Sequence, residues 1–163
     1  MIFSLFMIFL LLLRVGELLL SKRNEKWLLK NGAIEYGREH YPIMVLLHAC
    51  FMISLVVEYL IQPIASYSLV LIVIYFLLIV FKAWIILSLG KFWNTKIYRV
   101  KKFPLVNKGL YKVIKHPNYM IVIAEIVIIP LAFHLFYTAI IFTLLNLAML
   151  YVRIKEENKA LLI

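Results

Sequence analysis

Residues 119–152 read YMIVIAEIVIIPLAFHLFYTAIIFTLLNLAMLYV, a run of 34 residues that is almost wholly apolar. At about 1.5 Å per residue this run offers about 51 Å of helix, whereas one bilayer crossing needs about 30 Å and two need about 60 Å. The run is therefore long for one span and short for two. Pro130 and His134 lie near its centre, which favours a tight hairpin of two short helices at about 119–131 and 136–152.

Three other apolar runs predict membrane helices, at about 2–20, 42–60 and 65–89. Of the 163 residues, 65% are hydrophobic, and the mean hydropathy is +0.97. This composition excludes a soluble globular protein. We therefore predict an all-α integral membrane protein with five transmembrane helices, the last two forming the tight hairpin. Because no stretch leaves room for a soluble domain, we expect residues 1–163 to form one membrane domain.

The basic residues alternate with the five predicted spans. Five Lys or Arg lie in 21–40, eight in 90–118 and three after Tyr151, whereas 61–64 and 130–137 contain none. In a membrane protein such an excess sets topology more often than it binds nucleic acid. The positive-inside rule then predicts an external N-terminus, with the two basic loops and the C-terminus in the cytoplasm.

Ionisable side chains inside the predicted spans are candidates for function, because lipid tolerates them only at a cost. Arg14 and Glu17 are three residues apart on one helical face, which predicts a local ion pair. Glu58 and Lys82 lie near span ends, where we expect their charged ends to reach the interface. Glu125 has no basic residue within one turn of it. It is therefore a candidate for a structural or a catalytic carboxylate.

Three other polar residues in the spans have simpler interpretations. Asn146, in the facing half of the hairpin, is a possible partner for Glu125. His48 has no second His or acid at i+3 or i+4, so we expect a hydrogen-bonded packing residue rather than a metal ligand. Cys50 is the only cysteine, which excludes a disulfide and a Cys-based metal site.

Two polar segments flank the hairpin. Before it stands LVNKGLYKVIKHPNY at 105–119, in which Pro117 fits the first turn of a helix. The free N–H groups of such a helix N-terminus suit a carboxylate. After it stands RIKEENKAL at 153–161, whose Arg and two Glu have the i, i+3, i+4 spacing of a solvated ion-pair face. A cofactor that carries a carboxylate and a sulfonium would find complementary groups in the two segments.

Together these segments resemble the isoprenylcysteine carboxyl methyltransferase family, membrane enzymes that use S-adenosylmethionine. The family signature is approximately LVxxGxYxxxRHPxY, followed after a helical hairpin by RxxEExxL, and the resemblance covers residues 105–161. The upstream LGKFWNTKIYRV at 89–100 is similar to the strand-like lead-in of the family. Lys115 stands where the family usually has Arg, and Phe103 stands where eukaryotic members tend to carry His.

The resemblance implies a cofactor-binding half at about 90–163 that encloses S-adenosylmethionine on the cytoplasmic side, with a cytoplasmic cofactor-binding loop. It also implies a bacterial-type small member in the cytoplasmic membrane, and no metal. The residues expected to bind the cofactor are Leu105, Val106, Gly109, Tyr111, His116 and Tyr119. The residues expected to complete the catalytic site are Glu125, Arg153, Glu156 and Glu157, of which Glu125 is a candidate from its place in the span.

The expected activity is S-adenosylmethionine-dependent carboxyl- or O-methyl transfer to a lipophilic acceptor that enters from the bilayer. A prenylcysteine carboxylate is ionised near neutral pH and needs only a positive group such as Arg153 to position it. The hydroxyl of a long-chain phenol or alkylpyrone needs a base, for which Glu125 is the candidate. Two alternatives stay open: a non-catalytic membrane binding or assembly protein, and a small lipid carrier or transporter that uses Glu125.

Overall fold

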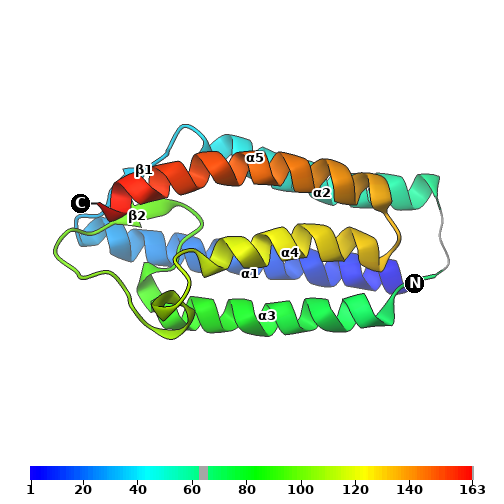
Figure 1. The fold of residues 1–163 in the computed structure, drawn as a ribbon, viewed down its shortest axis with the longest axis horizontal. Coiled ribbons are helices and arrows are strands. Elements are labelled where there is room, and N and C mark those ends of the chain that lie inside the picture. The colour runs from blue at the N-terminus through cyan, green and yellow to red at the C-terminus, as the bar shows by residue number, and fades with distance from the viewer. Residues whose placement is uncertain (63–65, 163) are drawn as a thin grey trace.

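The computed structural model describes residues 1–62 and 66–162, and five helices run along its long axis (Figure 1). The helices are α1 (Ile2–Lys30), α2 (Tyr41–Ile61), α3 (Leu69–Leu89), α4 (Pro117–Ala132) and α5 (Phe136–Leu161). The short elements are β1 (Ile34–Tyr36), η1 (Gly90–Phe92), β2 (Ile97–Arg99) and η2 (Gly109–Lys112). The predicted all-α fold, with five helices and a final hairpin, is confirmed. The expected start of the third span, at residue 65, lies outside the described residues.

Four of the helices are long and apolar enough to cross a bilayer: α1, α2, α3 with its 3-10 extension to Phe92, and α5. The fifth helix, α4, is apolar but only 16 residues long. The outer faces of the long helices expose large apolar side chains, including Leu12, Leu46 and Leu87, which are 55% exposed or more. Because water does not solvate such a surface favourably, this exterior is that of an integral membrane protein.

The hairpin turn forms just after the proline that predicted it. Pro130 lies in the last turn of α4, and His134 in the connection has a positive φ of 58°. The N–H of Leu135 donates to the carbonyl of Pro130 at 2.9 Å, which closes the turn. Because proline has no N–H, residue 130 cannot donate to the carbonyl of Ile126 four residues earlier, which weakens α4 just before it ends. Helix α5 starts at Phe136 and continues past the expected end at 152 to Leu161.

A buried carboxylate caps the start of α5, and it corrects one sequence expectation. Glu58 of α2 does not reach the interface: its two carboxylate oxygens accept from the N–H groups of Tyr137, at 3.0 Å, and Thr138, at 2.7 Å. The first N–H groups of a helix have no partner within the helix, and the helix dipole favours a negative charge there. Glu58 therefore fixes α2 to the hairpin at the end of the bundle opposite the chain's C-terminus (Figure 1).

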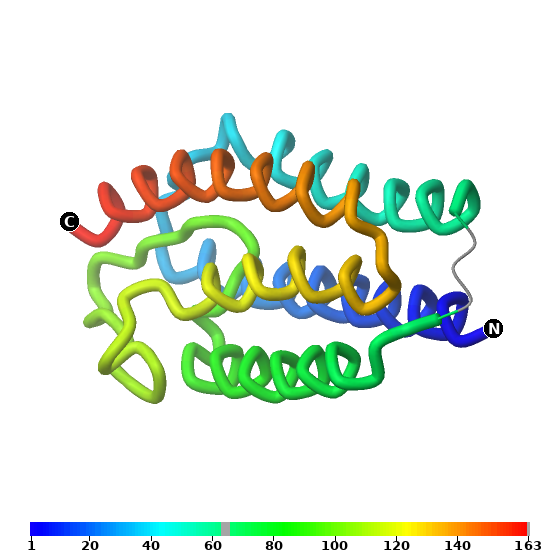
Figure 2. The backbone as a smooth tube through the Cα atoms, turned by 45° about the vertical axis from the view of Figure 1, so that its right-hand side comes forward, coloured from blue at the N-terminus to red at the C-terminus, as the bar shows by residue number. Residues whose placement is uncertain are grey.

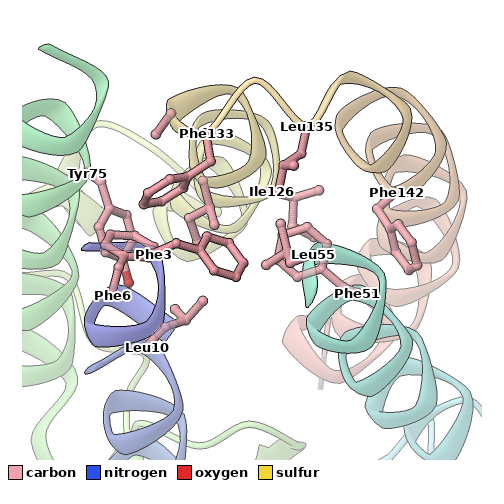
Figure 3. Packing of buried hydrophobic residues seen from close by; sticks show 12 residues of the cluster. Phe3, Phe6, Leu10, Phe51, Leu55, Tyr75, Ile126, Phe133, Leu135 and Phe142 are labelled. Atoms are coloured by element: carbon pink, nitrogen blue, oxygen red, sulfur yellow. The ribbon is translucent and has the colours of Figure 1, made fainter. Parts of the chain in front are cut away.

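The hydrophobic core joins α1 to the other helices. Helix α4 packs between α3 and α5, and α2 packs on α5. From α1, Phe3 stacks on the ring of Tyr59 with centroids 3.8 Å apart, and it meets Phe133 edge-on at 5.1 Å. Figure 3 shows Phe6 and Leu10 of α1 in the same cluster. These contacts hold α1 against α2 and the turn between α4 and α5.

The other end of the bundle carries the irregular segments. Strands β1 and β2 pair antiparallel, with Glu35 opposite Tyr98. This pairing ties the segment after α1 to the segment after α3, in the region where the family resemblance expects a strand-like lead-in. Figures 1 and 2 show the long connection between α3 and α4 at this end, together with the C-terminal part of α5. The two signature segments therefore meet at one end of the molecule.

Candidate active site

A cavity of about 810 Å³ lies at this end of the bundle. Its wall combines the segment from η1 to β2, the connection that precedes α4, the first turn of α4 and the last turns of α5. Seven of the residues expected at the site line it: Leu105, Val106, Tyr111, His116, Tyr119, Arg153 and Glu157. The structure thus brings both signature segments to one cavity.

Tyr119 and Arg153 form the link between α4 and α5. The Nε of Arg153 donates to the hydroxyl of Tyr119 at 3.0 Å, and the guanidinium also lies over the Tyr119 ring, 5.6 Å from its centroid. A second nitrogen of Arg153 donates to the carbonyl of Thr95 at 2.6 Å, and a third contacts the sulfur of Met44 at 2.8 Å. Because each of the three nitrogens has a partner, the buried guanidinium is held in one orientation.

His116 and Glu157 face each other beside this link. The Nδ1 of His116 lies 3.1 Å from Oε2 of Glu157, and the imidazole stacks on the ring of Tyr119 with centroids 5.4 Å apart. Nearby, burial and the charge of Glu157 raise the pKa of the Tyr111 hydroxyl. Tyr111 therefore keeps its proton at neutral pH and can act as a hydrogen-bond donor on the cavity wall.

Three expected site residues are not among the described residues that line this cavity: Gly109, Glu156 and Glu125. Gly109 has φ +56°, and a Cβ added to it would come 2.5 Å from the hydroxyl of Ser88 on α3. Its place is thus a close packing contact that only glycine fits. Glu156 is on the outer side of α5, where its carboxylate pairs with Lys159 at 2.5 Å.

Glu125 lies deeper in the bundle, and the expectation that it stands alone is wrong. Its carboxylate accepts from Arg14 of α1 at 2.9 Å and from Lys82 of α3 at 3.1 Å. Glu17 of α1 pairs with both cations, at 2.8 Å from Arg14 and 2.6 Å from Lys82. These four residues form a compact group with two charges of each sign, which we call the ionic cluster.

The ionic cluster also corrects two neighbouring interpretations. Lys82 does not extend to the interface, because its side chain is only 7% exposed and its Nζ lies between the two carboxylates. Asn146 is not the partner of Glu125: its Nδ2 is buried without a hydrogen bond to any described residue. The expected local pair of Arg14 and Glu17 is present at 2.8 Å, as one edge of the larger group.

A second cavity, of about 490 Å³, reaches the ionic cluster from between α1 and α3. Apolar side chains such as Leu13 and Ile79 form most of its wall, and Glu125 is part of it. Ile86 of α3 lines this cavity, whereas Leu89, one helical turn further on, lines the first cavity. The two cavities are therefore neighbours along α3.

The first cavity gathers the polar atoms that lack partners. Apart from Oε2 of Glu157, which faces His116, six buried side-chain nitrogens and oxygens have no hydrogen bond to any residue that the structure describes, and five of them belong to residues lining this cavity. The five residues are Trp93, Arg99, His116, Asn118 and Asn158. A buried polar group without a partner costs about 1–3 kcal/mol, so its concentration in one cavity indicates a ligand site. Within residues 1–62 and 66–162, no group of three His, Cys, Asp or Glu could hold a metal ion.

The fold and the cavity are those of a helical integral membrane protein with a polar cavity at one end of its bundle. The sequence model of the isoprenylcysteine carboxyl methyltransferase (ICMT) family matches residues 69–163, more than half of the chain. The chain belongs to this family of membrane methyltransferases. The match spans α3, the polar connection and the hairpin.

Two relatives align along nearly the whole chain. One, from Bacillus subtilis (strain 168) and named uncharacterized protein YpbQ, is 40% identical over 98% of this chain and 96% of the relative. The other, an uncharacterized protein of Haemophilus influenzae, is 30% identical over 93% of this chain and 90% of the relative. No solved structure matches the chain significantly.

Sequence reasoning missed several residues of the cavity wall. Trp93 and Arg99 lie in the lead-in segment, which the resemblance named without assigning any residue a role. Asn118 and Asn158 stand next to signature residues, at positions that the signature leaves variable. An unpaired buried amide can be identified only when its surroundings are known, so the sequence carried no clear signal for them.

Proposed function

We propose that this protein transfers a methyl group from S-adenosylmethionine to a lipophilic acceptor in the membrane. The observation that carries the proposal is the meeting of both signature segments at one cavity. Tyr111, His116 and Tyr119 come from the first segment, and Arg153 and Glu157 from the second. Family membership supports methyl transfer as the reaction.

The chemistry of the cavity wall fits this cofactor. S-adenosylmethionine carries an ammonium, a carboxylate, two ribose hydroxyls and a purine, so it can supply partners to both the donors and the acceptors that lack them. Glu157 brings a negative charge to the wall, and Tyr111 and Tyr119 bring aromatic rings. Both kinds of group attract the cationic sulfonium and ammonium.

When bound, S-adenosylmethionine supplies an electrophilic methyl carbon, and its sulfur leaves as a neutral thioether when an acceptor oxygen attacks in line. The protein has to hold the two reactants in line and exclude water from the site. Arg153 fits the positioning role, because its contacts with Tyr119 and Thr95 fix it at the inner wall of the cavity. There its positive charge attracts a negatively charged acceptor oxygen.

The second cavity fits the entry of the acceptor from the bilayer. Its wall is mainly apolar, it lies between α1 and α3, and it ends one turn of α3 from the first cavity. We propose that a lipophilic chain occupies it while the reactive group reaches toward the cofactor. Two acceptor classes are proposed: a prenylcysteine carboxylate, and the hydroxyl of a long-chain phenol or alkylpyrone. The proposed orientation places the site in the cytoplasm, where the cofactor is made.

Binding of S-adenosylhomocysteine, the demethylated cofactor, tests the proposal. Titration calorimetry on the purified full chain in lipid nanodiscs should show saturable binding. His116→Ala should raise the dissociation constant, because His116 lies against Glu157 and Tyr119. His134→Asn is the matched control, since it changes a histidine at the opposite hairpin turn and Asn tolerates the positive φ there. Wild-type protein that binds no S-adenosylhomocysteine would overturn the proposal in favour of a non-catalytic membrane protein.

A further inference from the structure

The connection between β2 and α4 carries a run of lysines without any acidic residue. Residues 101–116 read KKFPLVNKGLYKVIKH and contain five lysines, all of them exposed. None of the five forms an ion pair with a residue that the structure describes. These positive charges are therefore available to a partner outside the described part of the chain.

Part of this connection, η2, packs against the outer side of α3. A Cβ added to Gly109 would come 2.5 Å from the hydroxyl of Ser88 and 3.4 Å from Nε1 of Trp84. Trp84 is 47% exposed and Leu87 is 80% exposed, so this side of α3 is one that faces lipid. Tryptophan is enriched where the hydrocarbon meets the headgroups. The packing thus sets η2 beside the last two turns of a membrane-spanning helix.

Residues 108–113, which we call the basic segment, have two sides. Tyr111 lines the first cavity. Lys108, Lys112 and Val113 are not among the lining residues and are exposed, Val113 to 87%. Apolar and basic side chains on one exposed surface are typical of segments that lie in the membrane interface, with the charged ends among the headgroups. The outer side of the basic segment has this character.

We propose that the basic segment lies in the headgroup layer and binds anionic phospholipids. Val113 enters the edge of the hydrocarbon, and Lys108 and Lys112 pair with the negatively charged headgroups. Each such lysine adds about fivefold to the affinity for an anionic membrane surface. Lipid is favoured over an acidic protein partner, because the segment packs on the lipid-facing side of α3.

Lipid bound on one side of the basic segment also affects the cavity on the other side. Tyr111 stands between Lys108 and Lys112 in the chain, so a membrane that holds the two lysines also holds Tyr111 on the cavity wall. Anionic lipid and a cavity ligand then strengthen each other's binding. This consequence rests on the proposed function, whereas the lipid contact does not.

A fluorophore on Val113→Cys tests the contact. The background is Cys50→Ala, because Cys50 is exposed and would also be labelled. The full chain is placed in nanodiscs that contain brominated phosphatidylglycerol, which is anionic, or brominated phosphatidylcholine, which is not. Both lipids should quench the fluorophore, and the relative association constant should be at least about fivefold higher for the anionic lipid.

Two charge variants test which lysines are responsible. Lys108→Gln with Lys112→Gln should bring the two association constants close to equality. Lys22→Gln with Lys26→Gln is the matched control, because it removes the same charge from exposed positions of α1 and should keep the preference. Equal association constants in the protein without charge changes would overturn the assignment to anionic lipid.

A label at Lys30→Cys is the control for depth. The amide of Asn24 donates to the carbonyl of Gly90 at 3.2 Å, so Lys30 lies about 9 Å beyond the end of α3. Its fluorophore should be quenched by iodide in the water and not by brominated lipid. A fluorophore at residue 113 that behaves in this way would overturn the proposal and favour a protein partner for the lysines.

Titration of S-adenosylhomocysteine in the same two kinds of nanodisc tests the link to the cavity. Wild-type protein should bind it about fivefold more tightly with the anionic lipid, and the variant at Lys108 and Lys112 should bind it equally in both. Equal affinity of wild-type protein in both lipids would overturn the link. Quenching as expected without S-adenosylhomocysteine binding in either lipid would contradict the proposed function and support the lipid contact.

Discussion

Among single residues, Arg153 shows how the site is held before any ligand arrives. The residue is 6% exposed, and its guanidinium has partners in three separate segments: Tyr119 of α4, Thr95 before β2 and Met44 of α2. A buried cation needs such partners, because losing one leaves an uncompensated donor. Arg153 therefore supports the cavity wall as well as presenting a charge to it.

The hydroxyl of Tyr119 is the partner that can be removed most cleanly. Tyr119→Phe keeps the ring but leaves the Nε of Arg153 without an acceptor. We expect a loss of about 1–3 kcal/mol in the free energy of unfolding. Tyr151→Phe, at a residue of α5 that is 74% exposed, is the control and should change it little. Denaturant titrations of both variants in the same detergent provide the measurement, and equal stabilities would contradict this role.

We expect the stability of the protein to depend on equal numbers of positive and negative charges in the ionic cluster. Glu125→Gln leaves Arg14 and Lys82 with only Glu17 between them, so we expect a loss of about 3–5 kcal/mol. Adding Lys82→Gln removes the surplus positive charge, and the double variant should be more stable than Glu125→Gln alone. A double-mutant cycle of unfolding free energies measures this coupling. Additive losses would show that the cluster does not act as a unit.

The same pair of variants tests whether Glu125 is the base that a hydroxyl acceptor would need. If the acceptor is a hydroxyl and Glu125 takes its proton, turnover should fall about 100-fold in Glu125→Gln while cofactor affinity stays unchanged. The double variant with Lys82→Gln should regain stability but not turnover. A carboxylate acceptor needs no base. With such an acceptor, the turnover of each variant should fall only as far as the variant loses stability. Full activity of Glu125→Gln on a hydroxyl substrate would remove Glu125 from the mechanism.

The sequence could predict the part of the site whose residues lie at fixed spacing within one segment. His116, Tyr119, Arg153 and Glu157 stand at fixed offsets within two short segments, so their meeting could be anticipated. The ionic cluster could not, because its members come from α1, α3 and α4. Spacing within one helix made Glu125 look isolated, although its partners lie more than 40 residues away along the chain.

Among the structural elements, the packing of η2 against α3 depends on a glycine, Gly109. Gly109 has a positive φ, and an added Cβ would lie only 2.5 Å from the hydroxyl oxygen of Ser88. Gly109→Ala should destabilise the protein, and adding Ser88→Ala should restore part of the loss by removing the hydroxyl. The remainder should be about 1–2 kcal/mol, the cost of the left-handed conformation for a residue with a Cβ. Thermal unfolding of the single and double variants measures both parts, and complete rescue would show that the backbone is unstrained.

The α4–α5 hairpin was the element that sequence predicted best, and α5 shows where that prediction stopped. The length of the apolar run, with Pro130 and His134 at its centre, allowed only a tight turn. Hydropathy ends near 152, yet the helix continues to Leu161 because the polar last turns pack against the cavity segments. The cap from Glu58 could not be predicted, since α2 and α5 become neighbours only in the folded bundle.

For the whole molecule, the distribution of charge predicts its orientation in the membrane. The loop that contains 90–118 carries eight Lys or Arg and lies at the cavity end. A reporter inserted at Lys102 or fused to the C-terminus should be cytoplasmic, and one inserted at Gln62 should be external. Accessibility of the three reporters in intact cells is the measurement. A cytoplasmic reporter at Gln62 would contradict both the five-span topology and the proposed side of the active site.

Methyl transfer by the reconstituted protein tests the central claim most directly. The full chain in liposomes made from a native lipid extract receives S-adenosylmethionine labelled on its methyl group, and the lipid fraction is then analysed for label. We predict a labelled lipophilic product with wild-type protein and at least tenfold less with Glu157→Gln, which removes the negative charge of the cavity wall. Absence of label in every lipid, from protein that is folded and correctly inserted, would contradict the account.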